Sequence, residues 1–120
     1  MYACSVQTAS ADILPRSFPL LDDIATLLSG SPDITLVEIG GHADERGNDD
    51  YNLRLTGARA RSVKAYLVEK GIAGDRLIAN GYGEKQPTVD EQTHVACTAH
   101  TETCWEKNRR VEFKIVGQSR

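Results

Sequence analysis

The sequence predicts an α/β (α+β) sandwich in which two main helices cover one face of a mixed sheet, in the order strand, helix, strand, helix, strand, strand. Two segments place apolar residues at helical spacing, β-branched runs flank them, and the last apolar segment alternates with polar residues one by one. The 120 residues, 40% of them hydrophobic, are enough for one compact core and too few for two ordinary domains. We therefore expect residues 1–120 to form a single domain.

Two segments are predicted to be helical. The first, "SFPLLDDIATLLSG", begins with Ser17 as the N-cap and ends at Gly30. The second is expected to start at Thr56, a residue that favours the N-cap position, and to stop at Gly71. Its apolar stripe consists of Ala60, Val63 and Leu67.

Four segments are predicted to be strands. The run "DITLVEIGG" crowds β-branched residues into a short stretch and predicts a strand from Ile34 to about Gly41. "RLIANGYG" predicts a short strand that ends in glycines, and "RRVEFKIV" predicts a half-buried strand because apolar and charged residues alternate. A weaker strand from Cys4 to Thr8 completes the order.

The charge balance excludes some partners. The chain carries 14 basic and 17 acidic residues, a formal charge of -3, so it has no global attraction for nucleic acid or for an anionic membrane. Its longest uncharged run, Met1 to Ala11, is shorter than the roughly 18 to 20 residues of a membrane helix. No secretory leader is visible, and we expect a soluble chain.

Polar chemistry is concentrated in "GGHADERGNDDYN", residues 40–52, directly after a predicted strand. If that strand stays extended through Asp44, its two-residue period puts Glu38, Gly40, His42 and Asp44 on one side. Arg59 follows fifteen residues after Asp44, in the first turn of the predicted helix, where the helix dipole disfavours a cation. An anion is therefore expected close to Arg59.

Two interpretations of Asp44 and Arg59 are open from the residues alone. The two side chains could form an intramolecular ion pair that braces the connection between strand and helix. Alternatively both could face a ligand, because a carboxylate beside a guanidinium complements a zwitterion such as an amino-acid group. The two can coexist if the pair opens around a guest.

His42 is a candidate for catalysis and is interpreted as structural. A hydrolase would need a nucleophile or a metal beside the imidazole, and "GHAD" supplies neither a serine elbow nor the paired histidines of a zinc-protease helix. We expect no catalysis.

Three motifs in order, "GHADERGNDDYNLRLTGARARSVKAYLVEKGI", "GYGEKQP" and "NRRVEF", resemble the OmpA-like C-terminal domain family. The spelling "HADERG" is most similar to the peptidoglycan-associated lipoproteins within it. The resemblance covers about residues 10–116, which we take as the core of the domain.

The resemblance implies a module that binds peptidoglycan non-covalently and anchors an outer-membrane or periplasmic protein to the cell wall of a diderm bacterium. It implies the meso-diaminopimelate stem peptide as ligand, with Asp44 and Arg59 as the contacting pair. Asn52, Arg109 and Arg110 match further positions near the family's pocket. No cofactor and no nucleic acid are implied, and envelope proteins are possible partners. Membrane attachment would come only from parts of a longer protein.

One departure from the family pattern concerns the loop before the first helix. Family members often carry an aromatic residue followed by aspartate there, and the aligned residues here are Thr8 and Ala9, while Ser10 and Ala11 keep the pattern. One wall of the pocket is therefore expected to differ.

The segment "HVACTAHTETC" offers His94, Cys97, His100 and Cys104 as potential zinc ligands, at a spacing that matches no strong zinc pattern. We favour a disulfide between Cys97 and Cys104, worth on the order of 2 to 3 kcal/mol by loop closure. The oxidising periplasm implied by the resemblance agrees with it. Cys4 is then unpaired.

Two alternative functions follow. The first is a zinc-dependent cell-wall hydrolase that uses this loop, with His42 assisting, and the second is a protein-interaction module without wall affinity.

Overall fold

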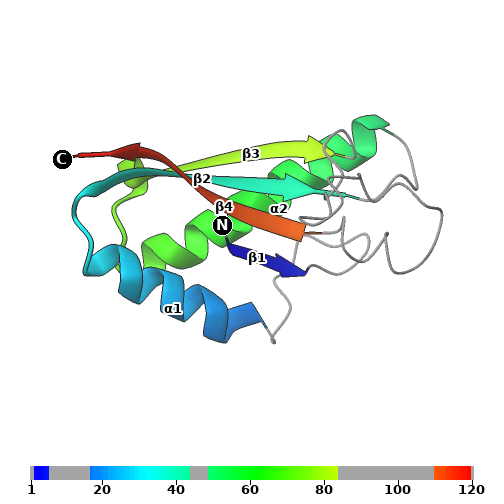
Figure 1. Ribbon diagram of the computed structural model, residues 1–120. Helices are drawn as coiled ribbons and strands as arrows, with labels where there is room; N and C mark the ends of the chain where they lie inside the picture. The colour runs from blue at the N-terminus through cyan, green and yellow to red at the C-terminus, as the bar shows by residue number, and fades with distance from the viewer. Residues whose placement is uncertain (1, 6–16, 44–48, 84–109, 120) are drawn as a thin grey trace, which may run out of the picture.

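The computed structural model describes residues 2–5, 17–43, 49–83 and 110–119 (Figure 1). The predicted order of strands and helices is confirmed. Within the described residues, neither long helix has the combination of length and apolar character needed to cross a membrane. The elements are β1 (Tyr2–Ser5), α1 (Phe18–Ser29), β2 (Ile34–His42), α2 (Asp49–Glu69), the short 3-10 helix η2 (Gly74–Arg76), β3 (Leu77–Gly83) and β4 (Arg110–Gln118).

The strands form one mixed sheet, as predicted, and their order across it is β1-β4-β2-β3. β2 and β3 are parallel, and β4 runs antiparallel to both β2 and β1. β1 lies beside only the first part of β4, from the pair Ser5↔Arg110 to the pair Tyr2↔Phe113. The carboxyl ends of β2 and β3 and the beginning of β4 consequently lie at the same end of the sheet (Figure 1).

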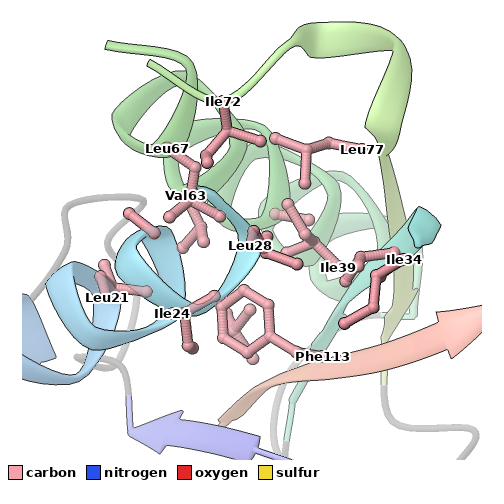
Figure 2. Packing of buried hydrophobic residues seen from close by; sticks show 14 residues of the cluster. Leu21, Ile24, Leu28, Ile34, Ile39, Val63, Leu67, Ile72, Leu77 and Phe113 are labelled. Atoms are coloured by element: carbon pink, nitrogen blue, oxygen red, sulfur yellow. The ribbon is translucent and has the colours of Figure 1, made fainter. Parts of the chain in front are cut away.

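Both helices pack on one face of this sheet, because the core residues of each strand alternate with residues of the other face, and in β2 an irregularity between Ile34 and Val37 brings Ile34 to the same side as Val37 and Ile39. α1 contributes Leu21, Ile24 and Leu28, and α2 contributes Val63 and Leu67 (Figure 2). The strand residues of the same core are Ile34, Val37, Ile39, Leu77, Val111 and Phe113. The other face is covered by neither α1 nor α2.

α1 begins after Ser17 and ends before Gly30, as the sequence predicts. β1 differs, because it occupies Tyr2–Ser5 instead of beginning at Cys4. β4 begins at Arg110 and alternates as predicted through Phe113. Ile115 then departs from the half-buried pattern and is 53% exposed, since it lies beyond the part of β4 that pairs with β1.

The start of α2 corrects the prediction. The helix begins at Asp49, so Thr56 lies inside it and is not its N-cap. The Thr56 hydroxyl donates to the Leu53 carbonyl oxygen (3.1 Å) and accepts from the Gly83 backbone N–H (3.0 Å). A side chain that favours N-caps is therefore used to bond a neighbouring strand, and Asp50 lies in the first turn, where the helix dipole favours an acid.

Glycines let α2 lie unusually close to the sheet. A Cβ atom on Gly41 would stand 2.1 Å from the Thr56 carbonyl oxygen, and one on Gly81 would stand 2.4 Å from the Gly57 backbone nitrogen. Helix backbone and strand backbone are in contact at both points. The amino-terminal half of α2 is thereby fixed against the carboxyl ends of β2 and β3.

Candidate functional site

The buried polar side chains of the described residues gather at one end of the molecule, which we call the polar end. They come from the first residue before α1, the end of β2, the amino-terminal half of α2 and the start of β4 (Figure 1). Buried polar groups are costly unless they are bonded, so their clustering marks a candidate site. The residues are Ser17, His42, Asn52, Thr56, Arg59 and Arg110.

One stripe of α2 changes character along its length. Asn52, Thr56 and Arg59 follow one another at helical spacing on the side that faces the sheet, and all three are buried. Farther along the same stripe, Val63 and Leu67 enter the hydrophobic core. The helix therefore carries an apolar half that stabilises the fold and a polar half that lies at the candidate site.

Arg59 is the central charge of this stripe. It lies in the third turn of α2, not in the first turn as predicted, because the helix begins at Asp49. Only 2% of its surface is exposed. A guanidinium stays protonated in proteins, and a buried charge requires compensation by opposite charge and hydrogen bonds. A buried Arg59 is thus suited to hold a carboxylate.

Asp44 lies outside the described residues, so its expected meeting with Arg59 stays a prediction. β2 ends at His42, and the Ala43 backbone N–H then bonds the Gly83 carbonyl oxygen (2.7 Å). The two-residue period of the strand therefore stops before Asp44 and does not determine on which side that carboxylate lies.

The opposite face of the sheet holds a second polar group of residues. Glu38, Gly40 and His42 share this face, as the sequence predicts, and Glu112 lies across from Gly40 on β4. The His42 ring stacks on Tyr82 with 5.1 Å between ring centroids, and His42 Nε2 lies 3.7 Å from Glu112 Oε2. Two strands thus meet His42 from either side.

His42 is neutral at neutral pH. Burial and the nearby Arg110 charge lower its pKa from 6.5 to about 4, against the opposing effect of Glu112 and Glu38. Its Nδ1 atom is buried and has no hydrogen-bond partner among the described residues. An imidazole of such low basicity is a poor general base near pH 7.

Two further contacts on this face were not predicted. Asn80 donates to Glu38 Oε2 (3.0 Å), and the Arg110 Nε donates to Glu112 Oε1. A hydrogen bond to Glu38 is the main cause that raises the pKa of Tyr82, followed by burial. The signal in the sequence was the parity of "ANGYG", which puts Asn80 and Tyr82 on the side of His42 once β2 and β3 are parallel.

The structure does not bring all the predicted site residues onto one face. Asn52 and Arg59 face the sheet from the α2 side, whereas Arg110 shares the other face with Glu112. A ligand that contacts both Arg59 and Arg110 would have to lie beyond the end of the sheet. Arg109 lies outside the described residues.

The cysteine and histidine loop also lies outside the described residues, so neither its disulfide nor its zinc alternative is tested. Within the described residues there is no group of three or more His, Cys, Asp or Glu side chains that could hold a metal ion. The predicted disulfide or zinc ligands in that loop, which stay untested, are His94, Cys97, His100 and Cys104.

Comparison with known proteins agrees with the resemblance in sequence. The model of the OmpA family matches residues 7–100. The peptidoglycan-associated lipoprotein of Pseudomonas aeruginosa is 38% identical over 105 residues, which are 88% of this chain and 56% of that protein. Outer membrane protein A of Serratia odorifera is 38% identical over 114 residues, 92% of this chain and 46% of that protein.

Among solved structures, the peptidoglycan-associated lipoprotein from Burkholderia pseudomallei superposes with a TM-score of 0.80 at 27% identity, covering 92% of this chain and 86% of that one. The chain spans about half the length of the two relatives compared by sequence.

Proposed function

The chain belongs to the OmpA family, and we propose that it binds peptidoglycan non-covalently through the diaminopimelate-containing stem peptide. The observation that carries the proposal is the buried Arg59 guanidinium, which lies with Asn52 and Thr56 on the polar half of α2. The name of the relative from Pseudomonas aeruginosa, a peptidoglycan-associated lipoprotein, supports the choice of polymer.

Binding follows from charge and shape. Arg59 takes the ligand carboxylate through two parallel hydrogen bonds, and Asp44 takes the ammonium group of the same zwitterion. The Asn52 amide, which can both donate and accept, orders the ligand or the loop around it. Arg109 and Arg110 line the outer wall at the end of the sheet. Since α2 is fixed by its glycine contacts, Arg59 is positioned before the ligand arrives.

In this proposal the domain binds its ligand and does not catalyse a reaction. The low pKa of His42 and its structural contacts support this interpretation over a hydrolase. In a cell the domain anchors an outer-membrane or periplasmic protein to the wall of a diderm bacterium, with other envelope proteins as possible partners. In that compartment, Cys97 and Cys104 form a disulfide.

Sedimentation with purified sacculi tests the site. We expect Asp44→Ala and Arg59→Leu each to lose about 30-fold or more in affinity, because removing one partner of a desolvated charge contact costs about 2 to 5 kcal/mol. Asp75→Ala is the matched acidic control, since Asp75 is exposed in η2 at the other end of the molecule. A folded Arg59→Leu variant that sediments like the parent protein would show that the site is assigned wrongly.

The alternative functions give different results in the same material. A zinc hydrolase predicts stoichiometric zinc in the purified protein and release of soluble muropeptides from the sacculi. A protein-interaction module without wall affinity predicts no sedimentation of the parent protein at all.

A further inference from the structure

The outer face of α2 carries a row of cations that the binding site does not use. Arg54 and Arg61 are exposed, and Lys64 is partly exposed. We call these three residues the basic ridge. Arg61 follows Arg54 by seven residues and Lys64 follows Arg61 by three, so the ridge lies within one side of the helix and extends about 15 Å along its axis.

The ridge cations differ from other cations of the described residues in their lack of direct partners. In the part of the chain that the structure describes, none of the three makes an ion pair or a side-chain hydrogen bond. Other cations are used internally, as Lys70 lies 3.7 Å from Asp22 and Arg110 bonds Glu112. From position 51 to position 68, α2 contains no acidic residue at all.

Helix stability does not explain Arg61 and Lys64 of the ridge. Cations stabilise a helix best in its last turn, and the last turn of α2 has no basic residue. An acid four residues before a cation adds support, and Asp50 holds that position for Arg54, whereas Arg61 and Lys64 have no acid there. The Arg61 guanidinium turns back over Gly57, where a Cβ atom would stand 3.2 Å from Nη1, so its charge lies toward the polar end.

We infer that the basic ridge is a second contact with the wall, which binds carboxylates of stem peptides next to the one held at Arg59. The inference rests on the proposed function. Its argument is charge complementarity, because the net charge of -3 repels a polymer with repeated carboxylates, whereas a local row of exposed cations attracts it. The ridge would therefore turn the outer face of α2 toward the polymer.

Sacculus sedimentation at low and high ionic strength tests the ridge. The triple variant Arg54→Gln, Arg61→Gln, Lys64→Gln should lose about 5- to 30-fold in apparent affinity at low salt. The loss should shrink strongly near 0.3 M salt, where exposed charges are screened. Lys114→Gln is the control, because Lys114 is also exposed but lies on β4, on the sheet face that α2 does not cover, and it should change affinity by less than about twofold.

The outcomes separate the ridge from the site. If the triple variant binds like the parent at low salt while Arg59→Leu loses binding, the ridge is wrong and the site stands. If only the triple variant loses binding, the ridge stands and the site assignment falls. If the affinity lost per removed charge equals that of Lys114→Gln, net charge alone explains the loss, and the ridge is not a specific contact. Absence of any sedimentation of the parent overturns both.

Labelled poly-L-glutamate is a second probe, because it presents carboxylates without a diaminopimelate ammonium group. At low ionic strength the parent and Arg59→Leu should bind it, and the triple variant should not. Equal binding by the parent and the triple variant, or none by the parent, contradicts the assignment of carboxylates to the ridge.

Discussion

His42 ends β2 as a neutral imidazole between two charged side chains. Its ring stacks on Tyr82 and lies close to Glu112, while Arg110 is bonded to the same carboxylate. Protonation would place a third charge in a buried position beside Arg110. His42, the last residue of β2, therefore favours the uncharged form.

The stability of the fold should depend on pH through this residue. The pKa of His42 is 6.5 when unfolded and about 4 when folded, so between these values the unfolded chain binds a proton that the folded chain does not. Above about pH 6.5, His42 does not lower the free energy of unfolding. As the pH drops from 6.5 to 4, its protonation in the unfolded chain lowers the free energy of unfolding by up to about 3 kcal/mol. Urea unfolding followed by circular dichroism at a series of pH values measures it.

His42→Gln supplies the comparison, because the amide keeps a polar group and does not titrate. Its unfolding free energy should vary less with pH than that of the parent between pH 5 and 6.5. Parallel curves for the two proteins would mean that His42 is not the source of the dependence.

The Arg76 side chain connects η2 to backbone carbonyl groups at the end of α1, in the turn after it and at the start of β2. Its side chain donates to the carbonyl oxygens of Leu28 (3.0 Å), Ser31 (3.1 Å) and Ile34 (2.8 Å from Nη2). Arg76→Met leaves these acceptors without their donor and should destabilise the protein by about 3 kcal/mol in urea unfolding. Arg61→Met, which removes an exposed arginine that makes no ion pair or side-chain hydrogen bond with the described residues, should cost less than about 0.5 kcal/mol. Equal destabilisation by Arg76→Met and Arg61→Met would contradict the stabilising role of the Arg76 hydrogen bonds.

At the scale of elements, the contact between α2 and the sheet depends on glycines. Gly41→Ala should destabilise by about 3 kcal/mol or more, because its Cβ would overlap the Thr56 carbonyl oxygen, which is backbone and has little freedom to move. Gly30→Ala is the control, since the nearest atom to its Cβ would be 3.6 Å away and its φ is -88°. Chemical unfolding measures both, and a Gly41→Ala variant as stable as Gly30→Ala would refute the close contact.

Element order was predictable because apolar periodicity is local. The start of α2 was not, since Thr56 has the chemistry of an N-cap and its true use, a bond to Gly83, depends on a strand far along the chain. The exposure of Ile115 likewise depends on how far β1 extends beside β4. Tertiary partners decided both points, and a local pattern does not contain them.

The candidate site was predictable in part for the same reason. The charge argument identified Arg59 and the family resemblance identified Asn52, and the structure places both on one buried stripe of α2. Alternation correctly placed Glu38 and His42 on one face of β2. It did not reveal that Glu112 of β4 and Tyr82 of β3 contact His42 on that face. Register between strands is a property of the folded sheet, so these contacts required the structure.

Over the whole molecule, the hydrophobic core and the proposed binding site occupy different parts of the same elements. The apolar half of α2, with α1 and the middle of the sheet, forms the hydrophobic core (Figure 2). The polar half of α2 and the starts and ends of the strands carry the buried polar groups. A ligand bound at the polar end should consequently order that end and leave the core as it is.

Hydrogen exchange with a soluble tripeptide containing diaminopimelate tests this division. At about 100 times its dissociation constant, the ligand should raise the free energy of unfolding by about 2.7 kcal/mol. Amides from Asn52 to Arg59 should gain protection against local opening, whereas those from Leu67 to Leu77 should change only through global unfolding. The same tripeptide with lysine in place of diaminopimelate is the matched control, because it lacks the distal carboxylate that Arg59 is proposed to hold. Equal protection by both tripeptides would remove that carboxylate from the mechanism, and protection spread evenly over both ends would mean that the polar end and the core are not separate units.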